Sequence, residues 1–349
     1  MAVHPTGGRA DTVGLGRRVV LSAFDGDTAS LSVDRAPRPV ARRGRVVVRV
    51  EAAGISYAEV QLLRGLHPFP PKLPAVPGYD LVGEVVEVGP GVEGWAPGDR
   101  VAAMPRSGAW QEYVEVRASI LAAVPRGVDA ARAVALVCNG VTAYQMAHRS
   151  AALRPGQVAF VQGATGGVGS VLTTLLVHHG VRVIGSASPA RHDTVRALGA
   201  EPVDYRGDVG AAVRALAPGG VDAVFDHIGG ASVSVGWGLL ARGGTLVSFD
   251  SSVDGFRSGQ WFRPHVPVLR KVLGWTVARA LGLTGGRTAK TYYVKPGDRF
   301  REDLAKLFAL VDEGVLDPVV HARYPLERAD EAVRALIGGG IVGKLVLVP

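Results

Sequence analysis

The feature that most constrains this chain is a glycine cluster between an apolar run and a helix-like segment. Residues 158–170 read VAFVQGATGGVGS, and the helical pattern VLTTLLVHHG follows directly. Gly163, Gly166 and Gly169 are three residues apart, and Gly167 lies between the last two. Strand, glycine turn and helix is the order that brings bare backbone to a dinucleotide pyrophosphate at a helix N-terminus. A plain βα turn is the alternative, but the strand VRVIGSAS that follows the helix favours a nucleotide site.

The end of that second strand indicates which nicotinamide cofactor is favoured. From Gly185 the chain reads GSASPAR, with no carboxylate before Asp193. An NAD site places Asp or Glu here for the ribose 2′-hydroxyl, whereas a 2′-phosphate needs cations and hydroxyl donors. Ser186, Ser188 and Arg191 supply such groups, so the sequence predicts NADPH. The alternative is that Arg191 is only a solvated helix residue.

Composition narrows the class of protein and of partner. The formal net charge is +8, but the arginines are dispersed and no recognition motif accompanies them, so we expect no nucleic-acid partner. The N-terminal stretch lacks the apolar region of a secretory signal, and no run has the length of a membrane span. We therefore expect a cytoplasmic protein without stable membrane insertion. Cys138 is the only cysteine, which excludes an internal disulfide and a cysteine-based structural zinc site.

The secondary-structure pattern changes along the chain. Residues 1–16 read as a flexible extension, and short strands with close turns follow up to about residue 124. Residues 129–153 have helical spacing, and from VAFVQG onward strands and helices alternate as in a doubly wound parallel sheet. Residues 254–292 interleave apolar and basic residues, which fits a lid or packing segment, a dimer contact or a membrane-surface patch. We favour the lid or packing role because the segment is internal.

These motifs together resemble the medium-chain dehydrogenase/reductase superfamily, in its zinc-free quinone oxidoreductase (zeta-crystallin-like) branch. The resemblance runs from about residue 17 to the end and is carried by GISYAEVQLLRGLHPFPPKLPAVPGYDLVGEVVEVG, GDRV, VTAY, GATGGVG, FDHIGG and GKLVL. It implies an α/β fold, with a GroES-like β-barrel catalytic domain (17–134 and 293–349) and a doubly wound Rossmann domain (135–292) that binds NADPH. It also implies a homodimer, with Rossmann sheet edges paired across a twofold axis.

The resemblance assigns cofactor residues position by position. Ala164, Gly166, Gly167 and Val168 would meet the pyrophosphate, together with the neighbouring Thr165. Ser186, Ser188, Arg191 and Tyr205 would hold the adenosine 2′-phosphate; for Tyr205 the alternative is an aromatic side chain that covers the sheet edge. The nicotinamide end would be lined by Thr142, Ile228, Phe249, Ser251 and Ser252.

The chain departs from its relatives around the reacting centre. Zinc-dependent relatives carry a Gly-His-Glu ligand motif where this chain has Gly78, Tyr79 and Asp80, so we expect no catalytic metal. Enoyl reductases of the superfamily place a tyrosine in Gly-x-Tyr-Pro as a proposed proton donor. This chain has Gly65, Leu66, His67 and Pro68 there, so His67 is the candidate donor, with a solvated structural histidine as the alternative. Tyr57 and Ser56 are alternative donors, and quinone reduction would need no dedicated acid.

The resulting functional expectation is a zinc-independent, NADPH-dependent reductase of a small-molecule conjugated carbonyl substrate, either a quinone or an enone or enoyl group. A biosynthetic tailoring enzyme would differ from it only in the size of its substrate. The alternative from another class is a catalytically impaired NADPH-binding protein with a sensor, structural or membrane-associated role, motivated by Ser56, Glu59, His67 and Asp250.

Overall fold

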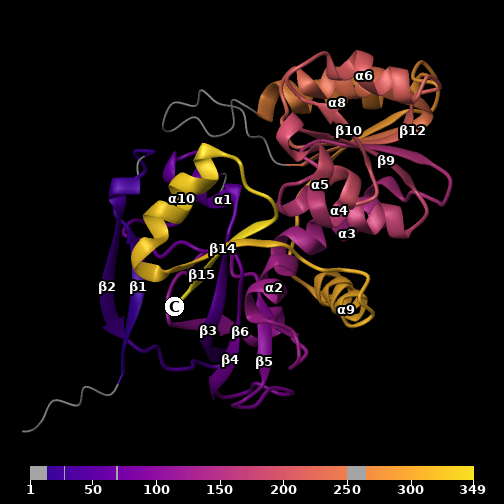
Figure 1. Cartoon of the computed structure of the whole chain (residues 1–349). Helices are drawn as coiled ribbons and strands as arrows, with labels where there is room; N and C mark the ends of the chain where they lie inside the picture. The colour runs from indigo at the N-terminus through magenta and orange to yellow at the C-terminus, as the bar shows by residue number, and fades with distance from the viewer. Residues whose placement is uncertain (1–13, 27, 68–69, 250–264) are drawn as a thin grey trace, which may run out of the picture.

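The computed structural model describes residues 14–26, 28–67, 70–249 and 265–349. Figure 1 shows two halves: the indigo N-terminal strands lie beside the yellow C-terminal segment, and the magenta and orange middle of the chain forms the other half. The predicted α/β architecture of a GroES-like catalytic domain and a doubly wound Rossmann domain is confirmed.

The catalytic domain is built from both ends of the described chain. Its larger sheet has the order β14-β15-β3-β4-β5-β7, with β6 also paired to β3. These strands are β3 (Arg45–Ile55), β4 (Leu81–Val88), β5 (Arg100–Ala103), β6 (Tyr113–Arg117), β7 (Ala122–Ala123), β14 (Val320–Pro325) and β15 (Lys344–Val348). β15 runs antiparallel to β3 and pairs Leu345 with Ile55, so the C-terminal strand completes a sheet begun near the N-terminus.

A two-stranded sheet and two helices cover this domain. β1 (Leu15–Leu21) pairs antiparallel with β2 (Leu31–Pro37), and β1 therefore begins inside the region that the sequence predicted to be an extension. Helices α1 (Tyr57–Leu63) and α10 (Ala329–Gly338) pack against each other. Trp110, fully buried, donates its indole N–H to the Gly54 carbonyl at 3.0 Å, which satisfies the one polar group of a large core side chain.

The Rossmann domain has a parallel sheet in the order β10-β9-β8-β11-β12-β13. Its strands are β8 (Val158–Val161), β9 (Arg182–Ala187), β10 (Glu201–Asp204), β11 (Val221–Asp226), β12 (Leu240–Phe249) and β13 (Thr288–Tyr292). The helices that alternate with the first five strands are α4 (Gly167–His178), α5 (His192–Ala197), α6 (Val209–Leu216) and α7 (Ser232–Leu239). The strand order reverses direction at β8, the point where ligands bind in sheets of this type.

Helical segments connect the two domains. The predicted helical region 129–153 consists of α2 (Ala130–Ala135), α3 (Val141–Gln145) and two π-helical turns at Leu136–Gly140 and Met146–Ala151. Helix α9 (Asp298–Asp312) packs against it through Asp303, whose fully buried carboxylate accepts two hydrogen bonds from Arg149 at 2.6 and 2.9 Å. One buried core includes Ala52 and Val82 from the catalytic domain together with Leu172 and Phe225 from the Rossmann domain.

The segment after β12 was predicted as a lid or packing element. Its residues 254–264 lie outside the described part of the chain, and the remainder forms α8 (His265–Ala280) and edge strand β13. Trp275 on α8 stacks on Trp237 on α7 with ring centroids 4.2 Å apart and planes at 4°. Among the helices in the described ranges, none is both long and apolar enough to span a bilayer.

Candidate functional site

The glycine turn between β8 and α4 is shaped by close backbone contacts. Gly163 has a φ of +61°, and its carbonyl accepts the N–H of Gly166 at 2.9 Å. A Cβ on Gly169 would lie 2.0 Å from that same carbonyl oxygen, which only glycine avoids. Gly166 is the N-cap of α4, and a Cβ there would meet only the Gly163 oxygen, at 3.4 Å. A helix N-terminus bordered by bare backbone fits a pyrophosphate.

The C-terminal segment lies directly against this turn. Gly343 donates its N–H to the Thr165 carbonyl at 2.9 Å and forms a bridge with Gly166. A Cβ on Gly167 would lie 2.2 Å from Asn139 Nδ2 and 3.2 Å from the Gly343 carbonyl oxygen. The catalytic domain and the interdomain helix therefore both contact the residues predicted to bind the pyrophosphate.

The residues predicted for the adenosine end differ in their burial and in their contacts. Ser186 is buried and its Oγ accepts the Gly163 N–H at 3.2 Å, so its side chain supports the turn from beneath. Ser188 and Arg191 are half-buried, and a Cβ on Gly340 would lie 3.2 Å from the Arg191 guanidinium. Within the described ranges Arg191 makes no ion pair. Tyr205 is 54% exposed at the end of β10, with the Arg206 guanidinium 5.8 Å from its ring centre.

Of the residues predicted for the nicotinamide end, Ile228 and Phe249 lie at the ends of central strands β11 and β12, and Thr142 lies on α3. Thr142 and Phe249 are buried, and Ile228 is exposed just after β11. The rings of Phe249 and His227 are 6.2 Å apart. Ala164 and Thr165 are buried within the turn, and Val168 is half-buried at the start of α4. Ser251 and Ser252 lie outside the described residues.

The three candidate proton donors occupy different environments. Ser56 is the N-cap of α1, and its hydroxyl donates to Glu59 Oε2 at 2.6 Å in a capping box, so its hydrogen is already used. Tyr57 begins α1 and is half-buried. His67 is only 6% exposed, and its ring meets that of Tyr79 edge-on with centroids 6.1 Å apart. His67 is therefore buried, and the alternative of a solvated structural histidine does not describe it.

Sequence reasoning missed a buried charge cluster beside these residues. Lys344 Nζ lies 3.8 Å from Asp80 Oδ2 and 3.4 Å from Asn139 Oδ1. Asp80 also accepts the Cys138 N–H at 3.0 Å, and Glu59 accepts the Tyr79 N–H at 2.8 Å. Burial raises the pKa of both Asp80 and Glu59, although Lys344 opposes that shift. Asp80 was noted only as a departure from a zinc motif, and nothing in the local sequence connected it with Lys344.

A tyrosine pair near the same cluster was also missed. The hydroxyls of Tyr79 and Tyr293 are hydrogen-bonded to each other, and the Arg106 guanidinium lies 5.6 Å from the Tyr293 ring centre. Burial is the main cause that raises the pKa of the Tyr79 hydroxyl, followed by the bond to Tyr293.

In the described ranges, no group of three or more His, Cys, Asp or Glu side chains is placed to hold a metal ion.

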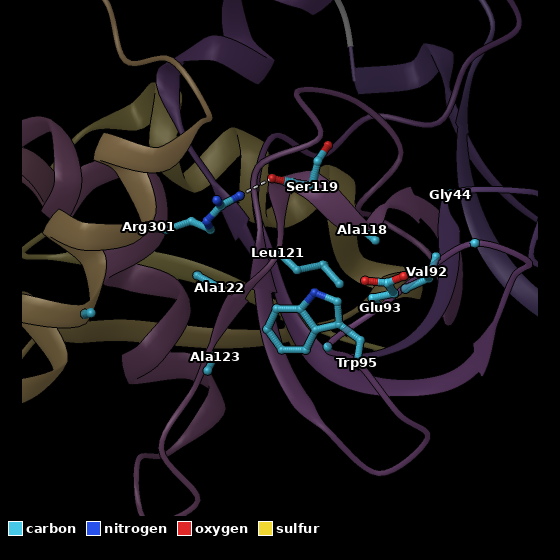
Figure 2. A pocket seen from close by; sticks show the side chains of 13 residues that line it. Gly44, Val92, Glu93, Trp95, Ala118, Ser119, Leu121, Ala122, Ala123 and Arg301 are labelled. Carbon is cyan, nitrogen blue, oxygen red and sulfur yellow. Dashed lines mark hydrogen bonds between the residues drawn. The ribbon is translucent and has the colours of Figure 1, made fainter.

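A separate pocket of about 710 Å³ lies on the catalytic domain. Figure 2 shows its walls, which come from the loop at 91–95, the segment at 118–123 and helix α9. Trp95 forms one side, and on the other Arg301 donates a hydrogen bond to the Ser119 carbonyl. None of the predicted site residues lines it.

Comparison with known proteins identifies the family. Residues 42–126 match the alcohol dehydrogenase GroES-like domain family, and residues 198–347 match the zinc-binding dehydrogenase family. The rat (Rattus norvegicus) synaptic vesicle membrane protein VAT-1 homolog is 31% identical over 345 residues, covering 95% of this chain and 84% of the rat protein. The chain belongs to the medium-chain dehydrogenase/reductase superfamily. Within that superfamily it falls in the zinc-free, quinone oxidoreductase-like branch, as its motifs predicted.

Other members of the superfamily support the same placement. A mycobacterial protein solved in complex with NADPH has a TM-score of 0.82 and 26% identity, covering 96% of this chain and all of its own. A quinone oxidoreductase from Pseudomonas syringae gives 0.82 and 25%, with the same coverage. Part of the Streptomyces halstedii polyketide synthase GfsB, 5% of its length, is 32% identical to 87% of this chain. By its family, this medium-chain dehydrogenase/reductase is an NAD(P)-dependent oxidoreductase.

Proposed function

We propose that this protein is an NADPH-dependent, zinc-independent reductase of conjugated carbonyl compounds, either quinones or enones and enoyl groups. The observation that carries the proposal is the glycine turn at the N-terminus of α4, together with the next strand end, residues 185–192, which contains Arg191 and no carboxylate. The bare amides fit a pyrophosphate, and the unpaired guanidinium fits the 2′-phosphate of NADPH better than the ribose 2′-hydroxyl of NADH.

The chain would use different residues along the length of the cofactor. The backbone amides at Gly167 and Val168 would hold the pyrophosphate beside Gly166, whose own N–H is used by the Gly163 carbonyl. Arg191 with Ser188 and Tyr205 would hold the 2′-phosphate. Thr142, Ile228 and Phe249 would position the ring end. Bound NADPH would supply a hydride to the substrate, while the protein supplies orientation and charge stabilisation. Of the predicted donors, His67 is best placed to serve as an acid, because the Ser56 hydroxyl is used by Glu59.

A second candidate is a cofactor-binding protein whose main role is structural or membrane-associated. It is favoured by the name of several relatives, synaptic vesicle membrane protein, and by exposed apolar residues on α8, namely Leu269, Leu273 and Val277. Flotation with liposomes would support this role if the protein rose with the vesicles and turned over no carbonyl substrate. The similarity to part of a polyketide synthase favours the tailoring-enzyme form of the first candidate instead.

The deciding experiment is a substrate screen at the nicotinamide absorbance with NADPH and NADH in parallel. We expect turnover of at least one quinone or α,β-unsaturated ketone and a preference for NADPH. Demonstrated NADPH binding without turnover of any tested compound would overturn the reductase proposal. We further propose a cytoplasmic homodimer, which light scattering and cell fractionation would test.

A further inference from the structure

Two tyrosine hydroxyls from distant segments meet beside the predicted reaction centre. Tyr79 precedes β4 and is 4% exposed, whereas Tyr293 follows β13 and is 43% exposed. Their hydroxyls form a hydrogen bond in which either can be the donor. The pair therefore connects a buried position of the catalytic domain with a solvent-accessible one at the end of the Rossmann sheet.

Arg106 adds a positive charge to this pair. Its backbone N–H donates to the Tyr79 carbonyl at 3.1 Å, and its guanidinium lies over the Tyr293 ring. Its Nε is buried without a hydrogen-bond partner, and in the described part of the chain no carboxylate pairs with this side chain. The residue also has a φ of +70°, a conformation that non-glycine residues adopt at a cost. A buried N–H of a cation without an acceptor indicates a place where an acceptor from outside the chain can bind.

The hydroxyl pair has a hydrogen to spare. Two phenol groups carry two hydrogens, and their mutual bond uses one. No other acceptor for either hydroxyl is found in the described ranges. Because burial raises the pKa of the Tyr79 hydroxyl, that group stays protonated across the working pH range and acts as a donor.

The neighbours of Tyr79 place this cluster at the reaction centre. The His67 ring contacts the Tyr79 ring, and Cys138 and Tyr292 pack against the same buried cluster that contains Tyr79. Cys138 is one helical turn before Thr142, the residue predicted for the nicotinamide end. The spare hydrogen and the unpaired guanidinium therefore lie close to where a reducible carbonyl would have to bind.

We propose that Tyr79, Tyr293 and Arg106 form the site that binds the carbonyl oxygen of the substrate. This inference rests on the proposed reductase function for its reaction step. Reduction adds one hydride and one proton across the conjugated C=C bond, and negative charge develops on the carbonyl oxygen in between. The spare hydroxyl hydrogen and the guanidinium stabilise that charge, the α carbon takes its proton from the proposed acid His67, which water then reprotonates, and both phenols end unchanged.

The test compares variants of the cluster with a matched pair elsewhere. Tyr293→Phe removes one hydroxyl at a partly exposed position, Arg106→Met removes the charge, and Arg106→Lys restores a charge without the planar fork. Tyr113 and Arg38 form a similar ring and guanidinium contact, at 5.1 Å, on the outer part of the catalytic domain. Tyr113→Phe and Arg38→Met are therefore the controls. Circular dichroism and NADPH titration establish that each variant is folded and binds cofactor.

Two readouts are needed. The first is kcat/KM for 2-cyclohexen-1-one and 1,4-naphthoquinone with NADPH, which we expect Tyr293→Phe and Arg106→Met to lower by about 10- to 1000-fold. The second is binding of 4-nitrophenol in the absence of turnover, because its ionised oxygen imitates the charged carbonyl and its absorbance reports ionisation. We expect the wild type to favour the bound phenolate, both cluster variants to lose this preference, and Arg106→Lys to recover part of it.

The outcomes separate this inference from the proposed function. If the cluster variants behave like Tyr113→Phe and Arg38→Met in both readouts, the carbonyl site is overturned even if the wild type is an active reductase. If the wild type reduces neither compound nor any in the wider screen, the reductase proposal fails. The phenolate titration then still decides whether the cluster binds a negatively charged oxygen.

Discussion

Lys344 and Asp80 form an ion pair that is closed off from solvent, with side chains 2% and 1% exposed and Nζ 3.8 Å from Oδ2. Lys344 begins the last strand of the catalytic domain, and its second contact, Asn139, lies on the interdomain helix against Gly167. The pair therefore lies between the catalytic domain and the predicted pyrophosphate turn. A buried charge that loses its partner is costly, because neither water nor another group replaces it.

Removal of the lysine should destabilise the protein strongly. We expect Lys344→Met to lower the free energy of unfolding by about 3–5 kcal/mol, since Asp80 would keep an uncompensated buried charge. Arg49→Met is the control: it breaks an exposed pair with Glu84 and should cost under about 1 kcal/mol. Urea denaturation of both variants gives the comparison. Similar losses of unfolding free energy in the two variants would contradict the expectation that the buried pair contributes more than the exposed one.

The buried Glu59 should leave a pH signature on stability. Burial raises the pKa of its carboxyl above the ordinary 4.5, so the folded protein binds its proton more tightly than the unfolded chain. The contribution of Glu59 to the free energy of unfolding therefore falls as pH rises from about 4.5 through the raised value. The stability of the wild type relative to Glu59→Gln should decrease over that window.

Glu331 provides a control of opposite sign for this measurement. Its pKa is lowered by Arg328, so its contribution is present above the ordinary pKa and is lost as pH falls. The free energy of unfolding of the wild type should therefore increase relative to that of Glu331→Gln as pH rises. Denaturation curves at matched pH values check both trends, and a flat difference for Glu59→Gln would contradict the first.

The glycine turn should tolerate no side chain at Gly169. A Cβ there would meet the Gly163 carbonyl at 2.0 Å, so we expect Gly169→Ala to distort the turn and to weaken NADPH binding by at least about tenfold, or 1.4 kcal/mol. Gly238→Ala, on helix α7 with open space around it, should instead raise stability by up to about 1 kcal/mol. Calorimetric titration and thermal unfolding distinguish the two, and unchanged affinity in Gly169→Ala would count against the proposed cofactor position.

Arg191 should decide between the two nicotinamide cofactors. We expect Arg191→Ala to raise the Kd for NADPH by about tenfold or more and to leave that for NADH unchanged, because only NADPH carries the 2′-phosphate. Arg196→Ala is the control, since Arg196 already pairs with Asp193 at 2.6 Å. Fluorescence titration of both cofactors measures the effect. Equal affinity of the wild type for NADPH and NADH would discredit the phosphate assignment.

Local sequence was sufficient to predict the elements around the cofactor turn. The spacing of Gly163, Gly166 and Gly169 predicted a strand, a tight turn and a helix start, because the close approaches at Gly166 and Gly169 both involve the backbone of Gly163, a few residues away. Ser186 shows the limit of this reasoning. Its position at the strand end was correct, but its Oγ accepts a backbone N–H beneath the turn, and alternation along a strand cannot specify that contact.

The polar interior of the site could not be read from the sequence. Asp80 contacts Lys344, and Tyr79 contacts Tyr293, across most of the length of the chain, and no local pattern records which distant side chain fills a buried position. The role of Arg106 could not be read from the sequence either, because it lies in a loop, where an arginine is ordinarily solvated. His67 was found because a family motif pointed to its loop, yet its burial against Tyr79 came from the structure alone.

The pairing of β15 with β3 also sets the order in which the protein can be completed. β3 occupies the centre of its sheet, and its end at residues 53–55 has no partner on one edge until residues 344–348 have been synthesised. The Rossmann sheet needs nothing beyond Tyr292, so it can form on the ribosome first. The nascent chain must then keep an apolar strand edge from pairing with other chains while the last fifty or so residues emerge. If translation slows near the end of the message, or if the chain is truncated just before Lys344, we therefore expect the product to aggregate through the N-terminal part of the catalytic domain, which is synthesised first.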